Sequence, residues 1–131
     1  MKKRLWVALL WGAMSVNALP IQKDEAFIQA IAKSQNSQKI ILMIYTTDDC
    51  PECAYMKKKV FHDPAVEPFL TQHFEIIEKN VHRNALPDGY DYFGIPTMFF
   101  INHAGVNKET LVGSKRPKAF ADDLHRIWKK K

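Results

Sequence analysis

An uninterrupted apolar run at residues 39–47, KIILMIYTT, constrains the fold of this chain more than any other feature. A strand with one face in water alternates apolar and polar residues, whereas this run is apolar or β-branched at nearly every position. The run therefore predicts a central strand that is buried on both faces. Such a strand needs helices on both sides of its sheet, so the run also predicts an α/β domain with a central sheet.

The remaining segments alternate between helical and strand patterns. Early strands separated by helices predict a parallel crossover, and a late hairpin adds antiparallel strands, so the sheet should be mixed. The start of one short helix stays open: Asp63 and Pro64 look like a cap and a first-turn residue, whereas Pro68 would then remove a hydrogen bond. In chain order, the predicted elements are a helix at 24–35, the strand at 39–47, a helix at 53–61, the short helix, strands at 74–81, 97–102 and 109–112, and a helix from Pro117.

The first 18 residues have the layout of a secretory signal peptide. A basic start precedes an apolar run at 5–14, and Val16 and Ala18 occupy the −3 and −1 positions before the expected cleavage site. The alternative is an uncleaved N-terminal anchor, although the run is short for a membrane-spanning helix. The sequence thus predicts export of one domain, residues 19–131, with membrane contact only through the signal segment. Cleavage would lower the basic residues from 19 to 16 against 14 acidic ones, which predicts no nucleic-acid binding.

The only two cysteines, Cys50 and Cys53, come directly after the buried strand, where a helical pattern begins. A thiol at a helix N-terminus becomes reactive because free N–H groups and the helix dipole favour its thiolate. A second thiol one turn later can attack the resulting mixed disulfide. Pro51 suits the first turn, where its missing N–H costs nothing. The pattern therefore predicts a redox pair, with Cys50 as the attacking thiol and Cys53 as the buried resolving thiol.

Other uses of the two cysteines are weaker predictions. A disulfide that closes a four-residue loop stabilises a fold by only about 2 kcal/mol, against about 3 kcal/mol for fifteen residues. A structural zinc site needs four ligands, and the histidines are scattered. Two thiolates alone suit Cu(I), so a copper-binding dithiol stays open. The five scattered histidines are His62, His73, His82, His103 and His125. No metal or cofactor is predicted.

Three carboxylates, Asp48, Asp49 and Glu52, surround the cysteine pair and are expected to face solvent. Negative charge beside a developing thiolate disfavours it, whereas the helix terminus acts in the opposite direction. We therefore expect Asp49, Pro51 and Glu52 to tune the redox potential, and the couple to be comparatively reducing.

A second motif, GIPT at residues 94–97, makes the chain resemble the thioredoxin fold family. Pro96 lies 46 positions after Cys50, just before a predicted strand. In thioredoxins a cis-proline at this place packs beside the Cys-x-x-Cys motif and helps to hold the substrate. The resemblance implies that Ile95, Pro96 and Thr97 bind substrate, with the backbone of Ile95 pairing to its extended chain. The sequence LVGS at 111–114 also matches the glycine that the family carries before its last helix.

The segment CPECAYMKKKVFHDPAVEPFL resembles the periplasmic branch of the family, in particular the C-terminal thioredoxin-like domain of the DsbD transmembrane reductase. That resemblance implies a monomeric thiol:disulfide interchange protein in the periplasm. Its partners would be disulfide-bearing proteins and a membrane or periplasmic thiol electron donor. The alternatives are a disulfide oxidase or isomerase, and a non-enzymatic module that delivers copper or haem.

The chain departs from the family pattern at two positions. The family usually carries a buried carboxylate six residues before the first cysteine, and here that residue is Ile44. The usual proton acceptor for the resolving thiol is therefore missing, and a water or Glu52 is the expected substitute. The tryptophan that usually precedes the first cysteine is replaced by Asp49.

Overall fold

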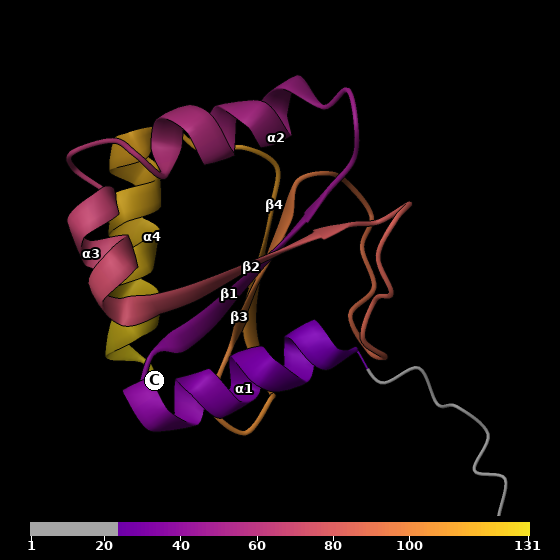
Figure 1. Cartoon of the computed structure of the whole chain (residues 1–131). Coiled ribbons are helices and arrows are strands. Elements are labelled where there is room, and N and C mark those ends of the chain that lie inside the picture. Colours follow the sequence, from indigo (N-terminus) through magenta and orange to yellow (C-terminus); the bar gives the residue numbers. More distant parts are fainter. Residues whose placement is uncertain (1–23) are drawn as a thin grey trace, which may run out of the picture.

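The computed structural model describes residues 24–131, so the predicted signal peptide at 1–18 lies outside the described residues. Within this part of the chain, no helix is long and apolar enough to cross a membrane. Figure 1 shows a twisted sheet between helices. The elements are α1 (Glu25–Ser37), β1 (Ile40–Thr46), α2 (Pro51–Tyr55), η1 (Met56–Val60), α3 (Glu67–His73), β2 (Phe74–Asn80), β3 (Thr97–Ile101), β4 (Asn107–Val112) and α4 (Pro117–Lys129).

The four strands form one mixed sheet in the order β2-β1-β3-β4. Strand β1 pairs parallel with β2 and antiparallel with β3, and β3 pairs antiparallel with β4. The parallel pair is joined by the helical crossover that the sequence predicts, and the late hairpin supplies the antiparallel strands. This topology confirms the α/β class with a central mixed sheet flanked by helices.

Strand β1 is buried at all of its positions, as its apolar run predicts. Successive side chains of a strand point to opposite faces, so β1 contributes to two cores. Leu42 and Ile44 pack on one face with residues of α2, η1, α3 and α4. Met43 and Tyr45 pack on the other face with α1 and the loop that precedes β3. The helices therefore cover both faces of the sheet (Figure 1).

The structure corrects one predicted helix start and settles another that the sequence left open. The helix with the cysteines begins at Pro51, two residues earlier than predicted, and its turns widen to a π-helix from Met56 to Val60. The short helix begins at Glu67, and Pro68 lies in its first turn, where a missing N–H is tolerated. Asp63 belongs to the preceding turn, in which its side chain accepts a hydrogen bond from the Ala65 N–H at 2.9 Å.

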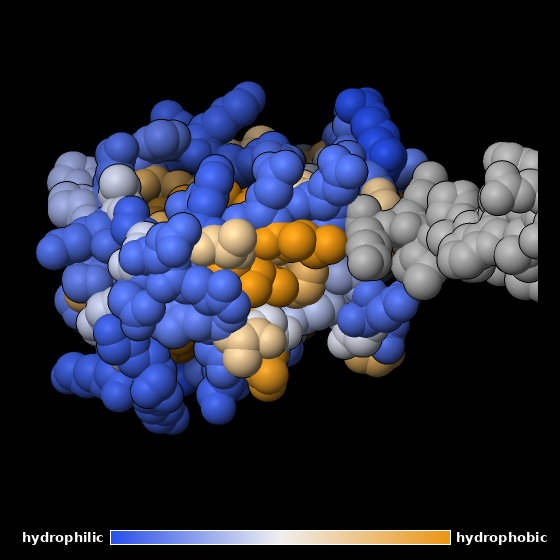
Figure 2. Space-filling model, turned by 60° about the horizontal axis from the view of Figure 1, so that its bottom comes forward, coloured by the Kyte–Doolittle hydropathy of each residue, from blue (hydrophilic) through white to orange (hydrophobic). Residues whose placement is uncertain are grey.

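The side of the molecule on which α1 lies is mostly hydrophilic, and its most prominent apolar area lies near the centre of the view (Figure 2). Helix α4 buries Phe120, Leu124 and Ile127 in the core, and Trp128 is partly buried against them.

Candidate active site

The two cysteines lie where β1 gives way to α2, and they form a disulfide with Cα atoms 5.3 Å apart. Cys50 is the N-cap of α2, and its Sγ accepts a hydrogen bond from the backbone N–H of Cys53 at 3.1 Å. Cys53 is buried, with 2% of its surface exposed, whereas Cys50 is only half-buried. The predicted difference in burial is confirmed, and it leaves Cys50 as the sulfur that a partner can reach.

The turn before Cys50 explains the position of Asp49. The backbone of Asp49 is left-handed, with φ of 53°. Among residues with a side chain, aspartate and asparagine adopt this conformation most readily. Pro51 then occupies the first turn of α2, as predicted. The sequence therefore folds the chain sharply from the end of β1 into a helix that starts at the first cysteine.

The GIPT motif lies at the same end of the sheet as the cysteine pair. Thr97 begins β3 and pairs with Tyr45 near the end of β1, because the two strands are antiparallel. The Ile95-Pro96 peptide bond is cis. The carbonyl of Pro96 accepts a hydrogen bond from the Gly113 N–H at 2.8 Å, which ties the loop to the end of β4. The fold thus brings the predicted substrate-binding loop and the dithiol to the same end of the sheet.

An exposed phenylalanine beside this loop is a residue that the sequence analysis missed. Phe93 is 99% exposed, and Val112 of β4 is 56% exposed. Gly94 lies between them: a Cβ atom added there would stand 3.2 Å from Cγ1 of Val112, so glycine allows the close approach. The available signal was the aromatic residue directly before GIPT.

The three carboxylates near the dithiol are exposed, as predicted, but two of them have bonding partners. Asp48 pairs with the Arg83 guanidinium at 2.5 Å. Glu52 accepts a hydrogen bond from the Ser114 hydroxyl, so its carboxylate is engaged on the solvent side of α2. Asp49 makes neither kind of bond with residues 24–131. Arg83 offsets the charge of Asp48, so the net negative charge near Cys50 is smaller than the sequence alone indicates.

Ile44 is fully buried beneath the cysteine helix, but a carboxylate stands beside it on the neighbouring strand. Glu78 of β2 pairs with Ile44 in the parallel ladder. Its carboxylate accepts hydrogen bonds from the Thr46 hydroxyl at 2.9 Å and from the Lys57 ammonium at 2.7 Å. Partial burial alone would raise the pKa of Glu78, but the hydrogen bonds from Lys57 and Thr46 lower it overall. The sequence analysis missed this cluster, because it depends on the register of two strands.

An open hollow of about 560 Å³ borders the cysteine pair. Both cysteines and the cationic residues Lys57 and Lys58 of the helix contribute to it. Within residues 24–131 there is no cluster of three or more His, Cys, Asp or Glu residues that would suit a metal ion. The hollow is lined by Thr47, Asp48, Asp49, Cys50, Pro51, Cys53, Ala54, Lys57 and Lys58.

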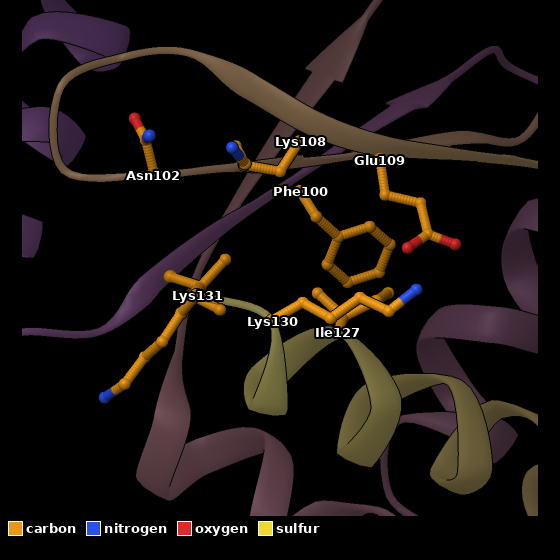
Figure 3. Close-up of a pocket in the computed structure, with 8 residues that line it drawn as sticks. Phe100, Asn102, Lys108, Glu109, Ile127, Lys130 and Lys131 are labelled. Atoms are coloured by element: carbon orange, nitrogen blue, oxygen red, sulfur yellow. The ribbon is translucent and has the colours of Figure 1, made fainter.

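A smaller cavity of about 250 Å³ lies at the opposite end of the sheet, where β1 begins and β3 ends. Phe100 and Ile127 form an apolar floor, and three lysines stand around it (Figure 3). The ammonium groups of these lysines point in different directions (Figure 3). Glu109 at its rim is paired with Arg126 at 2.6 Å. The cavity therefore lacks a convergent polar group, and the chemistry of the molecule lies at the dithiol.

Comparison with known proteins agrees with this geometry. The family model described as a thioredoxin-like domain matches residues 27–128. The thiol:disulfide interchange protein DsbD 1 of Pseudomonas aeruginosa is 30% identical over 90 residues, which cover 66% of this chain but only 15% of that protein.

Solved structures share the fold. A thioredoxin from Thermus thermophilus has a TM-score of 0.63 and 26% identity, covering 76% of this chain and 82% of its own. The reduced C-terminal domain of Neisseria meningitidis DsbD has a TM-score of 0.63 and 21% identity, covering 79% of this chain and 96% of its own. The predicted thioredoxin fold is thereby confirmed.

Proposed function

We propose that this chain, which belongs to the family of thioredoxin-like domains, is a thiol:disulfide oxidoreductase that reduces disulfides in proteins outside the cytoplasm. The observation that carries the proposal is the asymmetry of the pair. Cys50 is accessible at a helix N-terminus, and Cys53 is buried one turn later with its N–H on the Cys50 sulfur. That arrangement suits one thiol for attack and the other for release.

The reaction follows from these positions. In the reduced protein, the Cys50 thiolate attacks one sulfur of a substrate disulfide, and the other substrate sulfur leaves as a thiolate that takes a proton from water. The Cys53 thiol then gives its proton to water and attacks Sγ of Cys50, which breaks the mixed disulfide. The second substrate sulfur leaves as a thiolate that takes a proton from water. The substrate gains two electrons, and the protein is left with the Cys50–Cys53 disulfide, which a thiol electron donor must reduce.

The substrate segment would lie along the GIPT loop. Residues 95–97 lie at the same end of the sheet as Cys50, which supports a role for Ile95, Pro96 and Thr97 in holding an extended peptide. Phe93 and Val112 add exposed apolar surface beside this loop, suited to apolar side chains of a partly unfolded protein. We expect the protein to act as a monomer.

The proposed direction and location rest on different observations. The predicted signal segment at 1–18 supports export. The likeness to part of a DsbD protein supports a location in the periplasm and reduction by a membrane or periplasmic thiol donor. Asp49 and Glu52 beside the dithiol, with Pro51 between the cysteines, support a comparatively reducing couple, although Glu52 is engaged by Ser114.

A redox titration against glutathione, combined with an insulin-reduction assay, tests the proposal. We expect a potential nearer to the roughly −270 mV of thioredoxin than to the roughly −120 mV of DsbA-type oxidases. We also expect insulin reduction that Cys50→Ser abolishes. A potential near the oxidase value would instead favour a disulfide oxidase or isomerase. No insulin reduction, together with Cu(I) binding by the reduced protein, would favour a copper-delivery module.

A further inference from the structure

We propose that Lys57 stabilises the thiolate of Cys53 in the step that releases the substrate, and that Glu78 and Thr46 position Lys57 for this task. The inference rests on the proposed function, because it concerns the resolving step of the same dithiol. Lys57 would then contribute a cation where other members of the family contribute a buried carboxylate.

The position of Glu78 is the first argument. Glu78 and Ile44 are partners in the β1–β2 ladder, so their side chains share the face on which the cysteine helix packs. The neighbouring strand thus supplies a carboxylate next to position 44, where the family usually carries its buried acid. Thr46, with 1% of its surface exposed, also bonds to the Glu78 carboxylate, so a buried hydroxyl fixes the direction of that carboxylate.

The position of Lys57 is the second argument. Lys57 follows Cys53 by four residues on a continuous helix, and residues with this spacing are neighbours on one helix face. Lys57 and Cys53 line the same open hollow. The ammonium is held at 2.7 Å from Glu78, and only 37% of the Lys57 side chain is exposed. A long, flexible side chain is therefore held at the hollow that Cys53 also lines.

The chemistry requires such a charge. Cys53 is a poor nucleophile as a thiol, and it must lose its proton before it can attack Sγ of Cys50. A neighbouring cation favours the thiolate, and partial burial strengthens this effect. The Glu52 carboxylate, which the sequence offered as a substitute proton acceptor, is hydrogen-bonded to the Ser114 hydroxyl. The charged residues that line the hollow with Cys53 are Asp48, Asp49, Lys57 and Lys58, and Glu78 of β2 bonds to Lys57. On the other side of the helix, Glu52 shares a second hollow with Lys115 and Arg116 of the loop before α4.

The chromogenic aromatic disulfide DTNB separates the two chemical steps. Attack by Cys50 of the reduced protein releases one aromatic thiolate, and attack by Cys53 on the mixed disulfide releases a second. Stopped-flow absorbance across a pH series follows both phases. In Lys57→Met we expect the midpoint of the second phase to rise by about one pH unit. At neutral pH the second phase should slow by about fourfold, because the tenfold loss of thiolate is partly offset by greater nucleophilicity.

Matched variants distinguish charge from structure. Lys58→Met removes the same charge from the adjacent, exposed lysine and should leave the midpoint almost unchanged. Lys57→Arg should restore it. If Glu78 positions Lys57, the shift caused by Lys57→Met should be smaller in a Glu78→Gln background. Equal pH profiles for Lys57→Met and wild type would overturn the inference, as would equal shifts for the two lysines.

The proposed function fails in a different way. A wild-type protein that neither releases a second aromatic thiolate nor reduces insulin would overturn the proposed function itself. A wild-type protein that does both, with a normal second phase in Lys57→Met, would overturn only the role of Lys57. Circular dichroism and urea unfolding of each variant show that the fold is intact, which is expected for half-exposed side chains.

Discussion

Two consecutive residues of β2 carry lysine–carboxylate pairs on opposite faces of the sheet. Glu78 pairs with Lys57 on the face of the cysteine helix, at 2.7 Å, and their side chains are 43% and 37% exposed. Lys79 pairs with Asp24 at the start of α1, at 2.5 Å, and their side chains are 6% and 8% exposed. The same two chemical groups thus meet in two environments, which differ mainly in their access to water.

The buried pair belongs to the scaffold. Asp24 also caps α1 by accepting a hydrogen bond from the Phe27 N–H at 3.1 Å, so it joins the helix to β2. Tyr45 lies beside Lys79 in the ladder, and burial, with a further contribution from the Asp24 carboxylate, raises the pKa of its phenol. A buried charge without its partner is strongly destabilising, whereas a half-exposed pair contributes little to stability. The comparison therefore assigns stability to one pair and leaves the other free to serve chemistry.

The largest expected effect comes from breaking the buried pair. Lys79→Met removes the cation and leaves the Asp24 carboxylate buried, so we expect the free energy of unfolding to fall by about 3 kcal/mol. Urea unfolding measures this change. In an Asp24→Asn background, which keeps the cap, Lys79→Met should cost much less. Equal costs in the two backgrounds would mean that the pair is not the source of the stability.

The second prediction concerns the face of the sheet on which the cysteine helix packs, and it places a carboxylate at position 44. Ile44→Asp buries an acid beside Glu78 and Met98, and we expect a loss of about 2–3 kcal/mol at neutral pH. The loss should shrink at acidic pH, because a protonated carboxyl group costs less to bury. Ile44→Val is the control for lost volume, at about 1 kcal/mol. A fully stable Ile44→Asp protein would show that this face accepts the family's acid without Glu78 opposing it.

The sequence predicted the parts of the site that depend on neighbouring residues. The run at 39–47 is apolar at nearly every position because helices cover both faces of β1, and that requirement is written in the run itself. Cys50 and Cys53 are three positions apart, so their juxtaposition needs only the start of a helix. The helix at 24–35 was predicted from its own residues as well, and the structure places Asp24 as its N-cap.

Contacts between segments that are far apart in the chain could not be predicted from the sequence. Glu78 and Lys57 are 21 positions apart, and Asp24 and Lys79 are 55 apart. Whether these groups meet depends on the β1–β2 register, because a slip of one residue would exchange the faces of Glu78 and Lys79. The pairing of Asp48 with Arg83 was missed for the same reason. Such long-range contacts decide which of many surface charges influence the dithiol.

Removal of the half-exposed cation, Lys57, should have a small effect on stability. We expect Lys57→Met to lower the free energy of unfolding by less than 1 kcal/mol, because both members of its pair remain accessible to water. The measurement is urea unfolding of the oxidised protein beside Lys79→Met. A loss as large as that of Lys79→Met would make both pairs structural, and the contrast between the two faces would disappear.

The smallest effect expected is a pH dependence carried by Glu78. Its pKa in the folded protein is lowered by the hydrogen bonds from Lys57 and Thr46, which outweigh the effect of burial. A lowered folded pKa means that the fold favours the ionised carboxylate. The resulting stability is complete at pH values above the pKa of the unfolded chain, and it is lost as the pH falls through the folded pKa.

Glu78→Gln should therefore be less stable than wild type at neutral pH by a few tenths of a kcal/mol, the range of half-exposed ion pairs. Glutamine resembles the protonated acid in shape and charge, so the two proteins should converge in stability once the pH falls below the folded pKa of Glu78. Urea unfolding midpoints at neutral pH and across a series of acidic pH values measure the difference. A gap that persists in acid would mean that Glu78 stabilises β2 by packing, and that its charge matters only through Lys57 and the thiol beside it.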